Sequence, residues 1–154
     1  MSKGRVISID YGHARIGMAM SDEQQILANP QPTIKVEKKL EQTAQTVLKS
    51  LQALETQGYK FVTVVVGLPI KMNGTLGSMG EEAKKFAALL EEQLPVPVIL
   101  WDERLTSVQA ERSMREGNLT RKKRAKAVDS VAALIILQSY LDNQKNSFFP
   151  EGTV

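Results

Sequence analysis

The feature that most constrains how this chain can fold is a nearly uninterrupted apolar segment, Phe61 to Val66 (FVTVVV), between two amphipathic segments. A strand without polar alternation is typical of a parallel sheet in which both faces are covered. The flanking segments, 37–57 and 79–93, carry apolar residues at helical spacing, which predicts helices there. Strands joined through helices form parallel pairs, so the predicted fold is α/β with FVTVVV at the centre of the sheet.

Further strands and helices are predicted on both sides of this central unit. Pro30 and Pro32 exclude a helix around them and favour an edge strand or an irregular one. We predict strands at 5–10, 16–20, 26–36 and 98–101, and helices at 106–115 and 126–141. The expected architecture is one mixed sheet, with three N-terminal strands, then parallel strands with crossover helices, and helices on both faces.

The length of the chain, 154 residues, matches one domain, since a domain typically comprises roughly 100–200 residues. We place this domain at residues 1–142 and expect a loosely ordered C-terminal tail at 143–154. The sequence has no cysteine, which excludes disulfides, thiolate metal sites and cysteine nucleophiles. Because it begins without the apolar stretch of a signal peptide and has no segment fit to cross a bilayer, we expect a cytoplasmic protein without a membrane partner.

Acidic residues end two predicted strands and begin one predicted helix. Asp10 closes the first strand, Asp102 and Glu103 close the strand VILW, and Asp129 lies near the start of the apolar helix AVDSVAALIIL. Ligands bind beyond the carboxyl ends of the strands in sheets of this type. Carboxylates that converge there suit Mg²⁺, and two such ions about 3.5–4 Å apart stabilise both oxygens of a phosphodiester under attack by water.

Each carboxylate also has a structural interpretation. Asp10 can cap a turn, Glu103 can pair with a nearby arginine, and Asp129 can favour the positive end of its helix. The single histidine, His13, has no cysteine or evident serine partner, so a zinc site or a hydrolytic triad has little support. Three separate structural roles explain the joint pattern less well than one metal site does.

Basic residues are concentrated in one run. The net charge is only +3, but the sequence pI is about 9.2. The run comprises Arg121, Lys122, Lys123, Arg124 and Lys126. It indicates an anionic partner, although a charge run alone is more often a solvated surface. The loop GLPIKMNGTLGSMG opens the helix at 79–93, so its amides and Lys71 have the placement of a phosphate site, without the glycine spacing of a P-loop.

Four segments in this order resemble the YqgF family, also called RuvX, which is similar to Holliday-junction resolvases and belongs to the ribonuclease-H-like superfamily. They are IDYGHARIGMAMSD, VVVGLPIKMNGTLGSMGEEAKKFAALL, WDERLTSVQAERSM and KAVDSVAALIILQSYL, and they cover the chain to about Tyr140. The resemblance implies a ribonuclease-H-like fold and a Mg²⁺-dependent endonuclease, with Mn²⁺ as a substitute ion. The substrate it implies is pre-rRNA at the 5′ end of 16S ribosomal RNA, with branched DNA at a Holliday junction as the alternative.

By position, the resemblance implies that Asp10, Glu103 and Asp129 are the catalytic and metal-binding residues. Asp102 remains the alternative to Glu103, because alternation along a strand directs only one of two adjacent side chains towards the site. The cations expected to contact nucleic acid are Arg15, Lys71, Arg104, Arg121, Lys122, Lys123, Arg124 and Lys126.

Two other functions remain open. An acidic-glycine opening after a strand also begins actin-like kinases and ATPases, but those enzymes need two such domains and this chain has the length of one. A non-cleaving RNA-binding factor in ribosome assembly, in contact with ribosome-associated factors, would keep the fold and the acidic residues, since a fold does not guarantee activity. Nothing in the sequence identifies a dimer face, so the oligomeric state stays open.

Overall fold

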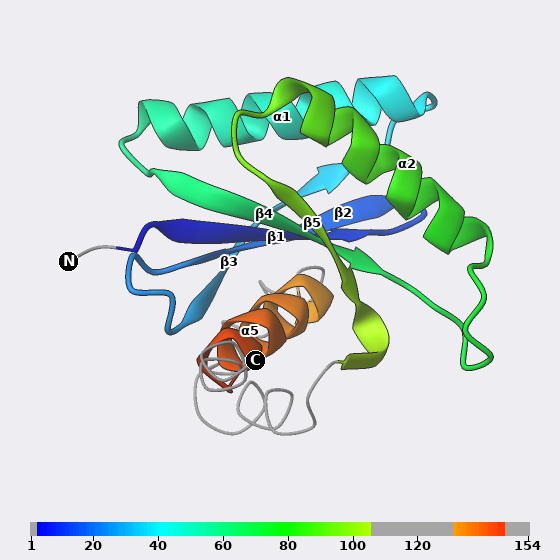
Figure 1. Cartoon of the computed structure of the whole chain (residues 1–154). Helices are drawn as coiled ribbons and strands as arrows, with labels where there is room; N and C mark the ends of the chain where they lie inside the picture. Colours follow the sequence, from blue (N-terminus) through cyan, green and yellow to red (C-terminus); the bar gives the residue numbers. More distant parts are fainter. Residues whose placement is uncertain (1–2, 106–130, 147–154) are drawn as a thin grey trace.

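The computed structural model describes residues 3–105 and 131–146. In chain order its elements are β1 (Arg5–Tyr11), β2 (Arg15–Ser21), β3 (Ala28–Lys35), α1 (Leu40–Thr56), β4 (Phe61–Leu68), α2 (Ser78–Gln93), β5 (Val98–Asp102), the 3₁₀ turn η1 (Glu103–Leu105) and α5 (Val131–Asn146). The strands form one sheet in the order β3-β2-β1-β4-β5 (Figure 1). Elements predicted within 106–130, including the helix at 106–115, lie outside the described residues.

The sheet is mixed, as predicted. β1 pairs antiparallel with β2, and β2 pairs antiparallel with β3, because short turns connect them. β1 and β4 are parallel, as are β4 and β5, because α1 and α2 provide the crossovers. The apolar segment FVTVVV is an interior strand, but the prediction that it is the central one is wrong. β1 occupies the middle, since the N-terminal hairpin adds two strands on its far side.

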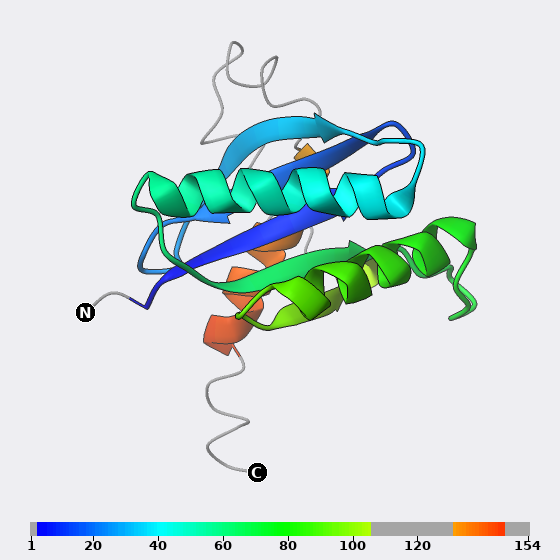
Figure 2. The same ribbon diagram turned by 90° about the horizontal axis from the view of Figure 1, so that it is seen from above.

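Helices cover both faces of the sheet. α1 and α2 lie over one face and α5 lies on the other (Figures 1 and 2). Strand alternation divides the core accordingly, since Ile7 and Ile9 pack under α1 and α2, whereas Val6 and Val65 pack against α5. From Val64 to Gly67, β4 is buried on both faces, which explains why this part of its sequence shows no polar alternation.

α5 extends further than the sequence predicted. The predicted end was residue 141, but the helix continues to Asn146, so residues 143–146 of the expected tail are helical. No proline or glycine follows before Pro150, and the intervening residues tolerate a helix. None of the described helices combines the length and the apolar character needed to cross a membrane.

Polar contacts fix α5 on the sheet in addition to its apolar packing. Ser8 Oγ, buried on β1, donates a hydrogen bond to the Ala133 carbonyl oxygen at 2.7 Å. Gln138 Oε1 accepts from the Ala28 amide at 3.2 Å, and Ser139 Oγ donates to the Leu105 carbonyl at 3.0 Å. These bonds join α5 to three separate parts of the chain.

We expect Ser8→Ala to lower the free energy of unfolding by about 1 kcal/mol, because it removes a buried hydrogen bond between β1 and α5. Urea unfolding measures this change. Ser78→Ala, on an exposed position of α2, is the control and should change it by less than about 0.5 kcal/mol. Equal effects of the two variants would show that the bond to Ala133 does not stabilise the fold.

Candidate active site

Asp10 lies at the carboxyl end of β1 on the face that α5 covers. Val6 packs against α5 and Ser8 bonds to it, so alternation places Asp10 on this same face. The carboxylate is partly buried, and burial raises its pKa above the usual value. Asp10 is therefore held in its charged form less readily than a surface aspartate, unless a cation is close.

Glu103 reaches the same place from β5. Ile99 and Trp101 both pack on the α5 side, and Glu103 begins η1 directly after β5, with its Oε2 3.0 Å from the place of a Cβ on Gly67. Burial, together with the negative charges of Asp10 and Asp102, raises the pKa of Glu103 to about 7. The structure thus brings Asp10 and Glu103, which are 93 positions apart in the chain, close enough to repel one another.

Asp102 is turned to a different partner. The Arg104 amide and Nε donate to Asp102 Oδ1 at 2.9 Å and 3.1 Å, and Arg104 Nη2 donates to Oδ2 at 2.9 Å. These bonds to Arg104 lower the pKa of Asp102. Of the two adjacent acidic residues, Asp102 pairs with arginine and Glu103 faces Asp10.

The sequence reasoning missed Gly67, which it treated as the beginning of a loop. Gly67 lies within β4 and faces α5. A Cβ atom added there would lie 2.5 Å from Ile136 Cδ1 and 3.0 Å from Glu103 Oε2. The missing side chain therefore gives room to both the helix and the carboxylate. The available signal was a glycine that directly continues an apolar strand, since such a glycine often marks a close approach.

Three predicted cations lie on the same rim of the sheet as Asp10 and Glu103. Arg15 begins β2, which runs back from the end of β1, and Lys71 follows the end of β4. Arg104 belongs to η1, where it pairs with Asp102. Asp129 and the basic residues at 121–126 lie outside the described residues.

The donor chemistry of this rim fits a divalent metal ion. Asp10 and Glu103 both have raised pKa values, and the charge of Asp10 contributes to that of Glu103, so a cation beside them would relieve their repulsion. Carboxylate oxygens are the ligands that Mg²⁺ takes. Within residues 3–105 and 131–146, no group of three or more acidic or histidine side chains is close enough to form a complete metal site.

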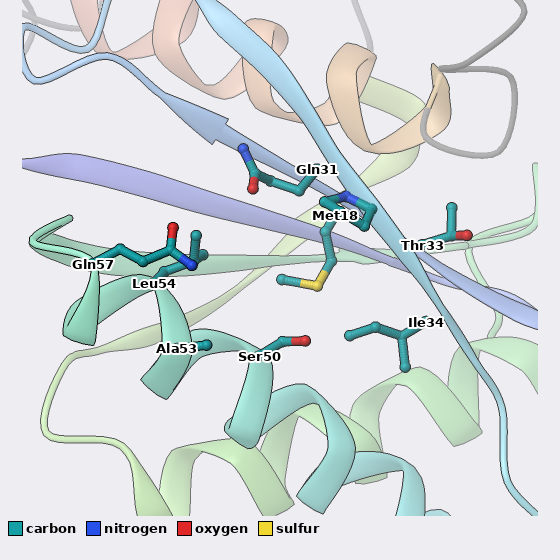
Figure 3. A pocket seen from close by; sticks show the side chains of 9 residues that line it. Met18, Gln31, Thr33, Ile34, Ser50, Ala53, Leu54 and Gln57 are labelled. Atoms are coloured by element: carbon teal, nitrogen blue, oxygen red, sulfur yellow. The ribbon is translucent and has the colours of Figure 1, made fainter.

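A separate cavity lies on the opposite face of the sheet. It has a volume of about 280 Å³ and is lined from β2, β3 and α1, with Met18 and Ile34 facing Ser50 and Leu54 (Figure 3). None of its lining residues is charged. This cavity is therefore unsuited to phosphate and distinct from the acidic rim.

Comparison with known proteins gives a consistent picture. A family model described as "RuvX: Holliday junction resolvase" matches residues 4–143. A relative from Protochlamydia amoebophila, named "Putative pre-16S rRNA nuclease", is 53% identical over 141 residues, covering 91% of this chain and 94% of the relative. One of the same name from Caldanaerobacter subterraneus subsp. tengcongensis is 45% identical over 146 residues, covering 93% and 99%.

Solved structures show the same fold at low sequence identity. Thermus thermophilus RuvC in complex with a Holliday junction substrate superposes with a TM-score of 0.60 at 13% identity, covering 94% of this chain and 97% of that one. A second structure of RuvC from this organism has a TM-score of 0.56 at 14% identity, covering 92% and 96%. The predicted ribonuclease-H-like fold is thereby confirmed.

We expect Glu103→Gln to stabilise the metal-free protein at pH 8 by about 1 kcal/mol, after allowance for solvent screening. The folded state holds the Glu103 proton up to about pH 7, whereas the unfolded chain releases it near 4.5. Stability should therefore fall as the pH rises through this window in the parent, and less so in the variant. Thermal melting at pH 4 and pH 8 measures this difference, and an equal effect at both values would contradict the burial of Glu103.

We expect Gly67→Ala to destabilise the protein by roughly 1–3 kcal/mol and to weaken binding of Mn²⁺, because the new methyl group meets both Ile136 and Glu103. Urea unfolding and calorimetric titration measure the two effects. Adding Ile136→Val removes the Cδ1 atom that the methyl group contacts. Stability should then recover while metal binding stays weak; recovery of both would assign Gly67 to helix packing alone.

Proposed function

Because the chain belongs to the RuvX family, we propose that it is a metal-dependent endonuclease that hydrolyses phosphodiester bonds near the 5′ end of pre-16S ribosomal RNA. The observation that carries this proposal is the pair of carboxylates, Asp10 and Glu103, brought together from separate strands at the carboxyl rim of the sheet. The names of the similar proteins support the substrate.

Asp10, Glu103 and Asp129 would hold Mg²⁺, with Mn²⁺ as a substitute. Asp129 precedes Val131, the first described residue of α5, by two positions in the chain. When bound, the ion supplies a charge that stabilises the phosphodiester under attack and lowers the pKa of a coordinated water. Asp102 is excluded from this role in the proposal, since its carboxylate is engaged by Arg104.

The protonation of Glu103 and the space beside Gly67 determine whether the site can hold a cation. Glu103 carries its proton below about pH 7, so it is available to a cation mainly above that pH. Gly67 leaves the space in which its carboxylate lies. Both carboxylates are partly buried, which limits their contact with water and strengthens their attraction for a cation.

The cations along the rim would contact the substrate backbone. Arg15, Lys71 and Arg104 are exposed, and they lie on the rim that carries Asp10 and Glu103. Contacts of this kind bind phosphates without reading sequence and weaken as salt increases. The same chemistry suits RNA and branched DNA, and the family description names the second. Contact with ribosome-associated factors belongs to the same proposal.

Purified protein with Mg²⁺ or Mn²⁺ should cut an RNA that spans the 5′ end of 16S ribosomal RNA. We expect Asp10→Asn to lower the rate by more than about 100-fold, because even the outer partners of metal ligands contribute roughly 10–100-fold. Its binding to the RNA should remain. Asp102→Asn, at the end of β5, is the matched control and should keep most of the activity. Gel assays of cutting, with anisotropy for binding, measure these effects.

Each alternative outcome has a distinct meaning. If Asp10→Asn cuts as fast as the parent, Asp10 is not a metal ligand. If the parent binds the RNA but cuts neither it nor a four-way DNA junction, the protein acts as a non-cleaving assembly factor. Cutting of the junction alone would replace RNA processing by junction resolution.

A further inference from the structure

The loop between β4 and α2 forms a small, closed projection on the acidic rim. Ile70 and Leu76 form an antiparallel bridge at its base. The Lys71 amide donates to the Thr75 carbonyl at 2.9 Å, and the Gly74 amide donates to the Lys71 carbonyl at 2.8 Å. Gly74 has a φ of +86°, which closes the turn in a conformation that favours glycine. We call residues 70–76 the rim loop.

Side-chain bonds and backbone packing fix the shape and direction of the rim loop. Asn73 Oδ1 accepts hydrogen bonds from the Thr75 amide at 3.1 Å and from Thr75 Oγ1 at 2.7 Å. Just before the loop, the Pro69 carbonyl lies 2.8 Å from the place of a Cβ on Gly80, so it packs closely on the first turn of α2. The tip is thus held away from the body of the domain.

Met72 occupies the tip and is 93% exposed. The other exposed large apolar residues among those described range from 36% to 58%. Burying a side chain of this size would stabilise the fold by roughly 1.5–3 kcal/mol. Met72 contributes no such stabilisation at its exposed position. The hydrogen bonds of the rim loop nevertheless keep it outside. The side chain of Met72 is therefore available for contact with a partner.

Lys71, next to Met72 in the chain, indicates that the partner is negatively charged. Its side chain lies against the start of α2, with Nζ 3.7 Å from the place of a Cβ on Gly77. A hollow of about 330 Å³ lies between Lys71 and the first residues of α2. The rim loop therefore carries a cation at the start of α2 and an apolar side chain at the adjacent tip, and a strand of nucleic acid likewise presents phosphates and bases at neighbouring positions.

We infer that the rim loop reads unpaired nucleotides, with Met72 packed on the face of an exposed base and Lys71 on a neighbouring phosphate. The inference rests on the proposed nuclease function and adds to it the feature of the substrate that is recognised. Paired bases cover their faces by stacking, so a single side chain on a narrow turn gains contact only where a base is unstacked. Methionine suits this contact because it is flexible and polarizable.

The test compares two RNAs of equal length, one fully paired and one with a single bulged nucleotide, in an Asp10→Asn background that does not cut. We expect Met72→Gln, which keeps the length but adds an amide, to weaken binding to the bulged RNA about tenfold, as loss of roughly one base contact would. Binding to the paired RNA should change less than about twofold, since its bases offer no exposed face. Met72→Leu, which keeps an apolar side chain, should bind the bulged RNA as the parent does. Fluorescence anisotropy measures affinity, and 2-aminopurine at the bulge reports the base contact.

Two further variants separate the apolar contact from charge and from general effects. Lys71→Ala should weaken binding to both RNAs and lower the slope of log affinity against log salt by about 1, whereas Met72→Gln should leave that slope unchanged. Leu27→Gln is the control, because Leu27 is also exposed but follows β2 at the opposite rim. It should bind both RNAs as the parent does.

Equal binding of Met72→Gln and the parent to the bulged RNA would overturn the inference. So would an equal loss on the paired and the bulged RNA, since the loop tip would then not distinguish unpaired bases. Failure of the proposed function is distinguishable, because cutting by the parent protein and its dependence on Asp10 are measured in a separate assay from these affinities.

Discussion

The seating of α5 mainly on β1, β2 and β3, with smaller contacts to β4 and β5, is the interaction on which the rest of this structure depends. It is made by apolar packing, by the bond from Ser8 to Ala133, and by the edge-on contact of Trp101 with Tyr140, whose ring centroids are 5.5 Å apart. The same helix reaches the candidate site, because Ile136 of α5 and the Glu103 carboxylate both lie against Gly67 of β4. The packing of α5 and the position of the Glu103 carboxylate therefore depend on the same small residue.

Such a site opposes folding in the absence of a cation. Burial and mutual repulsion both disfavour two charged carboxylates, and the chain compensates through the apolar core on each face of the sheet. Asp102 shows the contrasting solution, since an arginine two positions along satisfies its carboxylate at the surface. These two adjacent acidic residues thus have opposite environments, because Arg104 engages Asp102 whereas Glu103, the first residue of η1, lies against Gly67.

The residues that stabilise the fold and the residues of the candidate site lie in different parts of the molecule. The face under α1 and α2 is apolar, and its cavity is uncharged. The carboxyl rim of the sheet carries the acidic pair, the exposed cations and the rim loop with Met72. The RuvC structures share this fold at 13–14% identity, so the architecture persists while most side chains differ.

The sequence by itself determined the strands, the two crossover helices and the α/β class, because apolar spacing is a local property that burial imposes on each element. It also predicted Asp10 and the pair at 102–103, since both follow strands. Only the tertiary structure showed that Arg104 engages Asp102 while Glu103 lies against Gly67. Only the tertiary structure placed β1 at the centre of the sheet. The position of Glu103 and the strand order follow from contacts between residues far apart in the chain, such as the bond from Ser8 to Ala133, which no local pattern records.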